Sequence, residues 1–259
     1  MSPKVRNIII ATALVAVLAT LYFVRRNATM RGVDITVTHG GAELLTPPEV
    51  DSLLAIGFPQ LKHTSIKDLD SRAIREHLER HPYILKADVD VTWGGKLIVN
   101  VTQRDPVVRV FYEGNEFYLS HEGTCMPLCP KHYCNIVVGS SDYKEPRLKR
   151  PTQLQLSQEG GERPAALLRI WQLASFFYEN PRYGDVFDQI YVGSDGKLYA
   201  VPKLSSLYIV VGDAEELQTK FENLWAFFDQ GINQVGWDTY SAISLEYEGQ
   251  VVCTRAEAQ

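Results

Sequence analysis

The sequence lacks the motifs by which many enzymes and nucleic-acid-binding proteins are recognised. Its 259 residues contain no G-x-S-x-G nucleophile motif and no glycine-rich phosphate-binding loop. The net charge is −5, which argues against nucleic acid as a main partner. The six histidines fall in no recognisable catalytic arrangement. We therefore expect a protein that is not an enzyme, that needs no cofactor and that has no small-molecule substrate.

Cysteine is also scarce, with four residues, too few for a disulfide scaffold. Cys125, Cys129 and Cys134 lie within ten residues, whereas Cys253 lies near the C-terminus and is expected to be a small buried hydrophobe. A disulfide within the cluster, buried thiols and a metal site are the three alternatives. The cluster lacks the second, separated pair of ligands that structural zinc sites use, so we expect no metal. A disulfide is the simplest outcome if this part of the chain is exported.

Long apolar runs are absent except at residues 8–24, IIIATALVAVLATLYFV. As a helix with a rise of about 1.5 Å per residue, this run would extend about 26 Å. A span of about 17 to 25 residues is the usual range for crossing a bilayer. A cleaved signal peptide is the alternative, but the run exceeds the usual apolar length of about 7–15 residues and Arg25 follows it at once. We expect an uncleaved transmembrane helix, whose nearly balanced flanking charges do not determine its orientation.

The first half of the remaining chain has the pattern of a small sheet with two helices. Alternating residues at 32–38 indicate a strand, and a capping Thr46 with an acid three residues later begins a helix. A second helix is expected from about residue 67 to the His81-Pro82 step. Residues 87–93 and 96–102 alternate around Gly94-Gly95, which indicates a hairpin. The predicted order is β-α-α-β-β.

The second half of the chain is predicted to be a mostly antiparallel β domain with two helices. The helices are expected at residues 163–178 and 214–228, where apolar residues recur at helical spacing. Short strands precede, separate and follow them, and the chain closes on strands near residues 243–247 and 251–253. The predicted fold class is therefore α+β, with a single N-terminal transmembrane helix followed by two domains.

Three segments resemble one known family. "HPYILKADVDVTW" and "GKLIVNVTQRDPVVRV", with an Arg-x-Pro element at Arg104, look like the POTRA domain of the FtsQ/DivIB cell-division proteins. "VGWDTYSAISLEYEGQVVCTR" resembles the closing segment of the FtsQ β domain. The resemblance covers essentially the whole chain in order, but the cysteine cluster has no counterpart in the family pattern.

The resemblance implies a bitopic scaffold that recruits FtsB-like and FtsL-like division proteins, with other divisome proteins as candidates for POTRA. In the family, the last strand of the β domain receives the FtsB partner by strand addition. We expect proline at Val251 or Val252 to weaken binding more than alanine does, and Trp237 and Tyr240 to support the edge. Carried over by position, the partner-binding residues are Tyr247, Gly249, Gln250, Val251, Val252, Cys253 and Thr254.

The same resemblance implies a single-pass inner-membrane protein at the division septum, with a cytoplasmic N-terminus and a periplasmic C-terminal domain. A membrane-tethered POTRA-type chaperone or assembly factor that binds unfolded or transported polypeptide is the alternative function, and an envelope hydrolase is a third. The expected segments are a tail at 1–7, a transmembrane helix at 8–24, a juxtamembrane and POTRA segment at 25–110, a β domain at 111–255 and a tail at 256–259.

Overall fold

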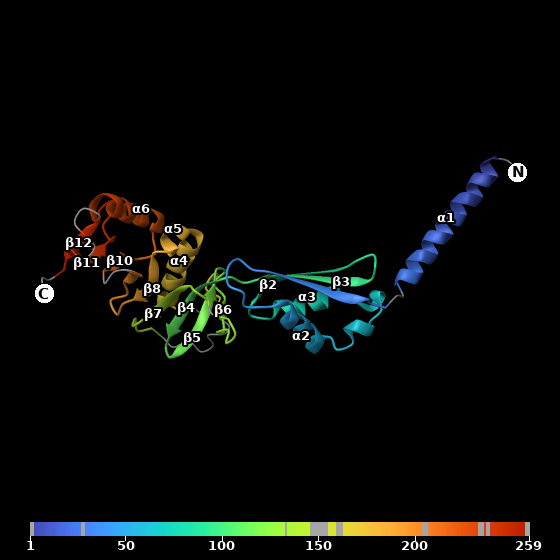
Figure 1. Ribbon diagram of the computed structural model, residues 1–259, viewed down its shortest axis with the longest axis horizontal. Coiled ribbons are helices and arrows are strands. Elements are labelled where there is room, and N and C mark those ends of the chain that lie inside the picture. Colours follow the sequence, from blue (N-terminus) through green and yellow to red (C-terminus); the bar gives the residue numbers. More distant parts are fainter. Residues whose placement is uncertain are drawn as a thin grey trace. The chain divides into compact units, whose positions relative to one another are not determined.

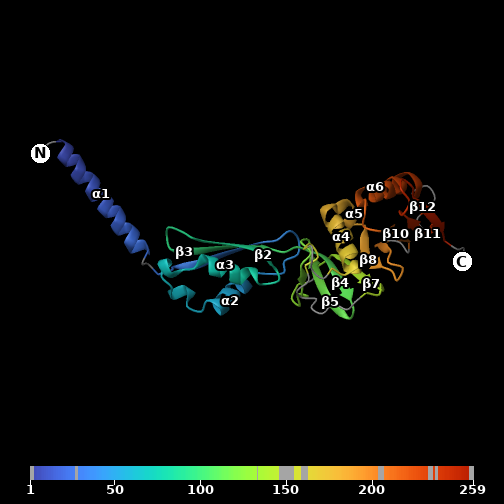
Figure 2. The same ribbon diagram turned by 180° about the vertical axis from the view of Figure 1, so that it is seen from behind.

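A computed structural model describes residues 3–26, 29–132, 134–145, 155–158, 163–203, 207–232, 236 and 239–256 (Figures 1 and 2). The chain divides into two compact units, Met1–Gln103 and Arg104–Gln259. The described residues form 12 strands and 6 α-helices, a mixed α/β content that corrects the expected α+β class.

The N-terminal apolar run forms a helix, α1 (Pro3–Arg26), that includes most of the tail expected at residues 1–7. In the part of the chain that the structure describes, no helix has both the length and the apolar character needed to cross a membrane. The expected transmembrane helix at residues 8–24 is therefore corrected. Its 17 residues, about 26 Å of helix, fall short of a hydrocarbon core of about 30 Å, and the rest of α1 includes Lys4, Arg6, Asn7, Arg25 and Arg26.

After α1, the first unit follows the order strand, helix, helix, strand, strand that the sequence indicated. Strand β3 lies in the middle of a three-stranded sheet, parallel to β1 and antiparallel to β2. Two 3₁₀ turns, η1 and η2, lie between its two helices. The elements are β1 (Gly32–Thr38), α2 (Pro47–Gly57), η1 (Leu61–His63), η2 (Ile66–Asp68), α3 (Ser71–Glu79), β2 (Ile84–Val91) and β3 (Lys96–Gln103).

Local hydrogen bonds position these elements. The carboxylate of Glu49 accepts from the N–H and the hydroxyl of Thr46, at 2.9 and 2.8 Å, and so begins α2. The Asp70 side chain accepts from the Ala73 N–H at 2.9 Å and begins α3. The buried side chain of Gln103 accepts from the N–H groups of Leu44 and Leu45, at 2.7 and 3.0 Å. These bonds fix the loop between β1 and α2.

The second unit contains a nine-stranded sheet with the strand order β12-β11-β10-β9-β8-β7-β4-β5-β6. Its elements are β4 (Pro106–Tyr112), β5 (Asn115–Ser120), β6 (Cys125–Met126), β7 (Val137–Ser141), α4 (Ala165–Glu179), α5 (Pro181–Gly184), β8 (Phe187–Val192), β9 (Leu198–Pro202), β10 (Tyr208–Gly212), α6 (Leu217–Phe227), a π-helical turn (Phe228–Ile232), β11 (Tyr240–Ser244) and β12 (Val252–Arg255).

This sheet is mixed, because three of its eight described pairings are parallel: β4 with β7, β7 with β8, and β10 with β11. The described residues of the unit also form three α-helices, where the sequence predicted two. Two of the parallel pairs arise because the chain crosses between neighbouring strands through a helix: α4 and α5 follow β7, and α6 follows β10. The short helix α5 went unpredicted because its four residues are too few for a periodic pattern.

An aromatic cluster holds helices α4 and α6 against the sheet. The rings of Phe177 and Phe187 stack with their centroids 4.9 Å apart. The fully buried ring of Phe221, from α6, meets both of them edge-on, at 5.3 and 5.6 Å. Phe176 and Tyr183 also contact Phe221, at 5.3 and 5.5 Å. This cluster supports the part of the sheet to which α6 and the last two strands belong.

Candidate partner-binding edge

The last strand, β12, forms one end of the nine-stranded sheet (Figures 1 and 2). It pairs antiparallel with β11 through Ala242↔Thr254, Ile243↔Cys253 and Ser244↔Val252. Among the described strands it has no other neighbour. The backbone on its outer side is therefore available for pairing with a further strand.

The direction of each backbone group in β12 follows from one hydrogen bond. The Ala256 N–H donates to the Thr239 C=O at 3.0 Å, so the backbone of Ala256 faces the β11 side. Successive residues in a strand direct their backbone groups to alternate sides. Thr254 and Val252 therefore also face β11, whereas the N–H and C=O of Cys253 face the open edge. The sequence alone could not give this assignment, because it depends on the register.

The side chains of β12 present a short, mostly uncharged surface. Val252 is 42% exposed, and Thr254 and Arg255 are exposed as well. Cys253 and the preceding Val251 are half-buried and pack against the core of the unit. Burial raises the pKa of the Cys253 thiol, which favours its neutral form. An added strand would therefore contact backbone groups and small uncharged side chains along residues 252–254, and the charge of Arg255 only at the end of β12.

The structure places the seven predicted residues in two different settings. Val252, Cys253 and Thr254 are in β12, and Val251 comes just before it. Tyr247, Gly249 and Gln250 are instead in the turn between β11 and β12, where the Gln250 N–H donates to the Tyr247 C=O at 3.1 Å. The turn uses the left-handed φ of +65° at Gly249, a conformation that glycine adopts without strain.

Two further residues complete the edge. Arg255 is the fourth residue of β12 and pairs with Tyr240, although the sequence argument had not included it. No alternation in the sequence Val-Val-Cys-Thr-Arg marks Arg255 as part of the strand, so its inclusion depends on the structure. Tyr240 begins β11, and its ring centroid lies 6.0 Å from that of Phe227, so it supports the edge from behind. Trp237, which was expected to do the same, lies outside the described residues.

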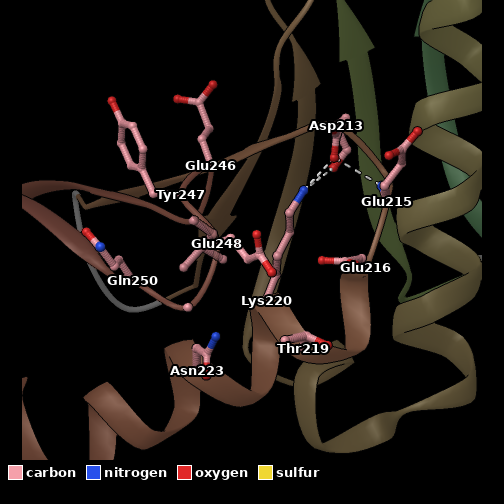
Figure 3. Close-up of a pocket in the computed structure, with 12 residues that line it drawn as sticks. Asp213, Glu215, Glu216, Thr219, Lys220, Asn223, Glu246, Tyr247, Glu248 and Gln250 are labelled. Carbon is pink, nitrogen blue, oxygen red and sulfur yellow. Dashed lines mark hydrogen bonds and ion pairs between the residues drawn. The ribbon is translucent and has the colours of Figure 1, made fainter.

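A pocket of about 310 Å³ lies between the first turn of α6 and the segment that joins β11 to β12 (Figure 3). Its lining is strongly acidic, and the side chains come from both walls (Figure 3). The acidic residues that line it are Asp213, Glu215, Glu216, Glu246 and Glu248.

Lys220 is the positively charged side chain among the described residues that line this pocket. Its ammonium donates to the Asp213 carboxylate and to the Asp213 carbonyl, the latter at 3.2 Å. The hydrogen bond from Lys220 holds the pKa of Asp213 below its usual value. On the other wall, Glu246 pairs with Lys197 at 2.8 Å, and this hydrogen bond raises the pKa of Lys197. The first ion pair joins the end of β10 to α6, and the second joins the segment after β11 to the residue before β9.

The cysteine cluster lies at the opposite end of the sheet. Cys125 is in β6, while Cys129 and Cys134 follow in the connection to β7. The described residues contain no disulfide bond, and Cys125 and Cys134 are buried. Among the described residues, no three His, Cys, Asp or Glu side chains are grouped so that they could hold a metal ion.

Comparison with known families places the candidate edge within a recognised domain. A family model described as FtsQ/DivIB, C-terminal related, matches residues 105–254, which is more than half of the chain. The match begins just before β4 and ends within β12, so it includes all seven predicted partner-binding residues. No curated protein matches the chain.

Proposed function

The chain belongs to the FtsQ/DivIB C-terminal related family, and from this premise we propose that it is a non-enzymatic division scaffold that binds a partner by strand addition at β12. The family supports a role in cell division and a place at the division site. The proposed partners are FtsB-like and FtsL-like division proteins. The proposal includes no catalytic step.

The observation that carries this proposal is the position of β12 at the end of the described sheet, with the Cys253 backbone directed outwards. A partner strand that hydrogen-bonds to these groups would become the tenth strand. In this mode of recognition the main chain supplies most of the affinity, and the side chains of alternate residues supply the specificity. Val252 and Thr254 would lie against one face of the added strand, and Cys253 would lie against the other.

The turn at Tyr247, Gly249 and Gln250 has a different role in this proposal. These residues are not in a strand, so they do not pair with the partner as β12 does. Tyr247 is 58% exposed, and its ring can contact side chains of a partner that extends past the start of β12. We assign backbone pairing to β12 and side-chain contacts to the turn.

We also propose that the first unit is a POTRA domain. Its support is the order β-α-α-β-β with β3 between β1 and β2. The family match begins at residue 105, so this assignment rests on the first unit's own architecture. Other divisome proteins are the proposed partners of this unit.

The test is the binding of an extended segment of the FtsB-like protein from the same organism to the full chain. Cys253→Pro removes the N–H on the open edge, whereas Cys253→Ala keeps it. We expect proline to raise the dissociation constant at least tenfold, a loss of about 1.4 kcal/mol of binding free energy, and alanine to leave it nearly unchanged. Circular dichroism of both variants controls for folding. Equal binding by the folded proline variant would contradict strand addition at β12.

The structure sharpens the choice of proline positions. Proline at Val252 removes an N–H that faces β11, so it would disturb the scaffold's own pairing. Photocrosslinking from Val251 in growing cells provides a second measurement, and capture of one division protein is the expected result. Broad binding of unfolded polypeptides, in place of one short segment, would favour the chaperone function.

A further inference from the structure

The three clustered cysteines are distributed over two faces of the β5–β6 hairpin. In the register of this hairpin, Leu119 is opposite Cys125 and Tyr118 is opposite Met126. Residues directly opposite one another have their side chains on the same face, and successive residues alternate between faces. Leu119 and Cys125 both belong to the hydrophobic core that α4 covers. Tyr118 and Met126 therefore lie on the other face.

Cys134 lies on the Tyr118 face. The Tyr118 hydroxyl donates a hydrogen bond to the Cys134 sulfur, and Cys129 is close enough to interact electrostatically with both groups. Cys134 is only 2% exposed, whereas Cys129 is partly exposed. Burial raises the pKa of the Cys125 thiol to about 12, and no other ionisable group contributes to that shift. Cys129 and Cys134 therefore both lie near Tyr118, whereas Cys125 lies on the opposite, core-facing side of the hairpin.

We propose that Cys129 and Cys134 form a dithiol pair that closes to a disulfide, and that Cys125 takes no part in it. The bond would close a loop of six residues in the connection between β6 and β7. Because β7 begins at Val137 and pairs in parallel with β4, this bridge would fix the chain just before a long-range strand pairing. Short loops gain less stability from a disulfide than long ones.

The reaction requires an oxidant that carries a disulfide, such as oxidised glutathione or a thiol–disulfide oxidoreductase. The thiolate of the accessible Cys129 attacks one sulfur of that disulfide and displaces the other as a thiolate, leaving a mixed disulfide. The Cys134 thiolate then attacks the Cys129 sulfur and displaces the second thiolate. The two cysteine protons end on the two departing thiolates, so the oxidant is reduced to two thiols while one S–S bond forms in the protein.

The sequence allows a direct test on the full chain. We would equilibrate the protein over a range of reduced-to-oxidised glutathione ratios, alkylate the remaining thiols, and digest with trypsin. Cleavage after Arg109, Lys131 and Lys144 gives fragments 110–131 and 132–144, which only a disulfide can hold together. We expect the joined fragments to appear as the ratio becomes oxidising, and fragmentation of the joined species to place the bond at Cys129.

Three variants sharpen the assignment. Cys129→Ser and Cys134→Ser should each abolish the joined fragments, whereas Cys125→Ser should retain them. Because Cys125 is buried and its variant could fail to fold, fragmentation of the wild-type species decides between Cys125 and Cys129 independently. A bond at Cys125, a joined species that persists in Cys129→Ser, or glutathionylated Cys129 without a bridge at the most oxidising ratio would overturn the proposal.

Discussion

The two sheets of this protein end in different ways. In the first unit, the Thr92 N–H donates to the Lys96 C=O, so the backbone of Thr92 faces the β3 side. Backbone groups of successive residues point to alternate sides of a strand, so the N–H of Ala87 in β2 faces outwards, away from β3. That outward N–H donates to the Glu79 carboxylate of α3 at 3.1 Å, and the neighbouring Lys86 and Asp88 form an ion pair at 2.7 Å. Charged side chains are a common protection of an edge strand.

The end of the second sheet has neither of these protections at Val252, Cys253 and Thr254. These residues are uncharged, and Cys253 directs its backbone to the open side without a side-chain acceptor comparable to Glu79 among the described residues. β12 is also only four residues long, which limits unwanted pairing. The β2 edge is thus closed by a side-chain acceptor, whereas the described residues supply no such acceptor at the β12 edge.

The largest loss of stability should come from disrupting the aromatic cluster that supports the open edge. Phe221→Ala deletes a fully buried ring in contact with four other aromatic rings, so we expect the second unit to lose about 3–5 kcal/mol of unfolding free energy. Leu78→Ala, at an equally buried position of the first unit, is the matched control. Hydrogen exchange measured on peptides from each unit should show the larger loss of protection in residues 104–259 for Phe221→Ala. A loss of the same size in both units would contradict the assignment of this cluster to the second unit.

A charged side chain placed on β12 should protect this edge against strand addition, as charged side chains protect β2. Val252 is 42% exposed, so Val252→Lys should change the stability of the fold by less than about 0.5 kcal/mol. We expect it to weaken binding of the FtsB-like segment about tenfold, because an edge lysine disfavours strand addition. Titration calorimetry would measure the affinity.

Val252→Thr is the control for this substitution, since it keeps the branched shape and adds no charge. It should bind nearly as well as the native chain. If lysine and threonine weakened binding equally, charge would not be the cause, and the contrast between the two edges would lose its explanation.

The sequence predicted the elements of residues 32–103 well because their signals are local. The capping acid at Glu49, the proline that follows His81 and the hairpin at Gly94-Gly95 each mark a boundary found in the structure close to its expected place. The order of the strands in the sheet of the second unit was harder to predict, since the parallel pairings join strands that are distant in sequence. Periodicity identifies strands but not their neighbours.

The candidate site was predicted in part for the same reason. Residues 251–254 were placed by resemblance at the end of the domain, and the structure has residues 252–254 in the edge strand and Val251 just before it. The assignment of Tyr247 and Gln250 to the turn, and the outward direction of the Cys253 backbone, depend on a register that no sequence pattern determines. The expected transmembrane helix was wrong, because a run of 17 residues was at the lower limit of the length required.

A smaller effect is expected at the protected edge. Glu79→Ala removes the acceptor of the Ala87 N–H, and Ala87 is fully buried, so the first unit should lose about 1 kcal/mol of unfolding free energy. Glu76→Ala is the control, because the one ion pair of Glu76 among the described residues is with the exposed Arg72, and its loss should cost less than about 0.5 kcal/mol. Urea unfolding of both variants would measure the difference, and equal losses would mean that Glu79 does not close this edge.

The smallest effect concerns the pocket behind the open edge. Lys220 holds the pKa of Asp213 below its unfolded value, so the ion pair contributes stability above about pH 4 and loses it as pH falls through the lower folded pKa. Because the Asp213 side chain is 57% exposed, solvent screening keeps this contribution below about 1 kcal/mol. Lys220→Met should therefore destabilise the protein slightly at pH 7, and the difference from the native chain should shrink in acid. A difference of the same size at pH 7 and at about pH 2 would show instead that the stem of Lys220 acts by packing, since that term does not depend on the charge of Asp213.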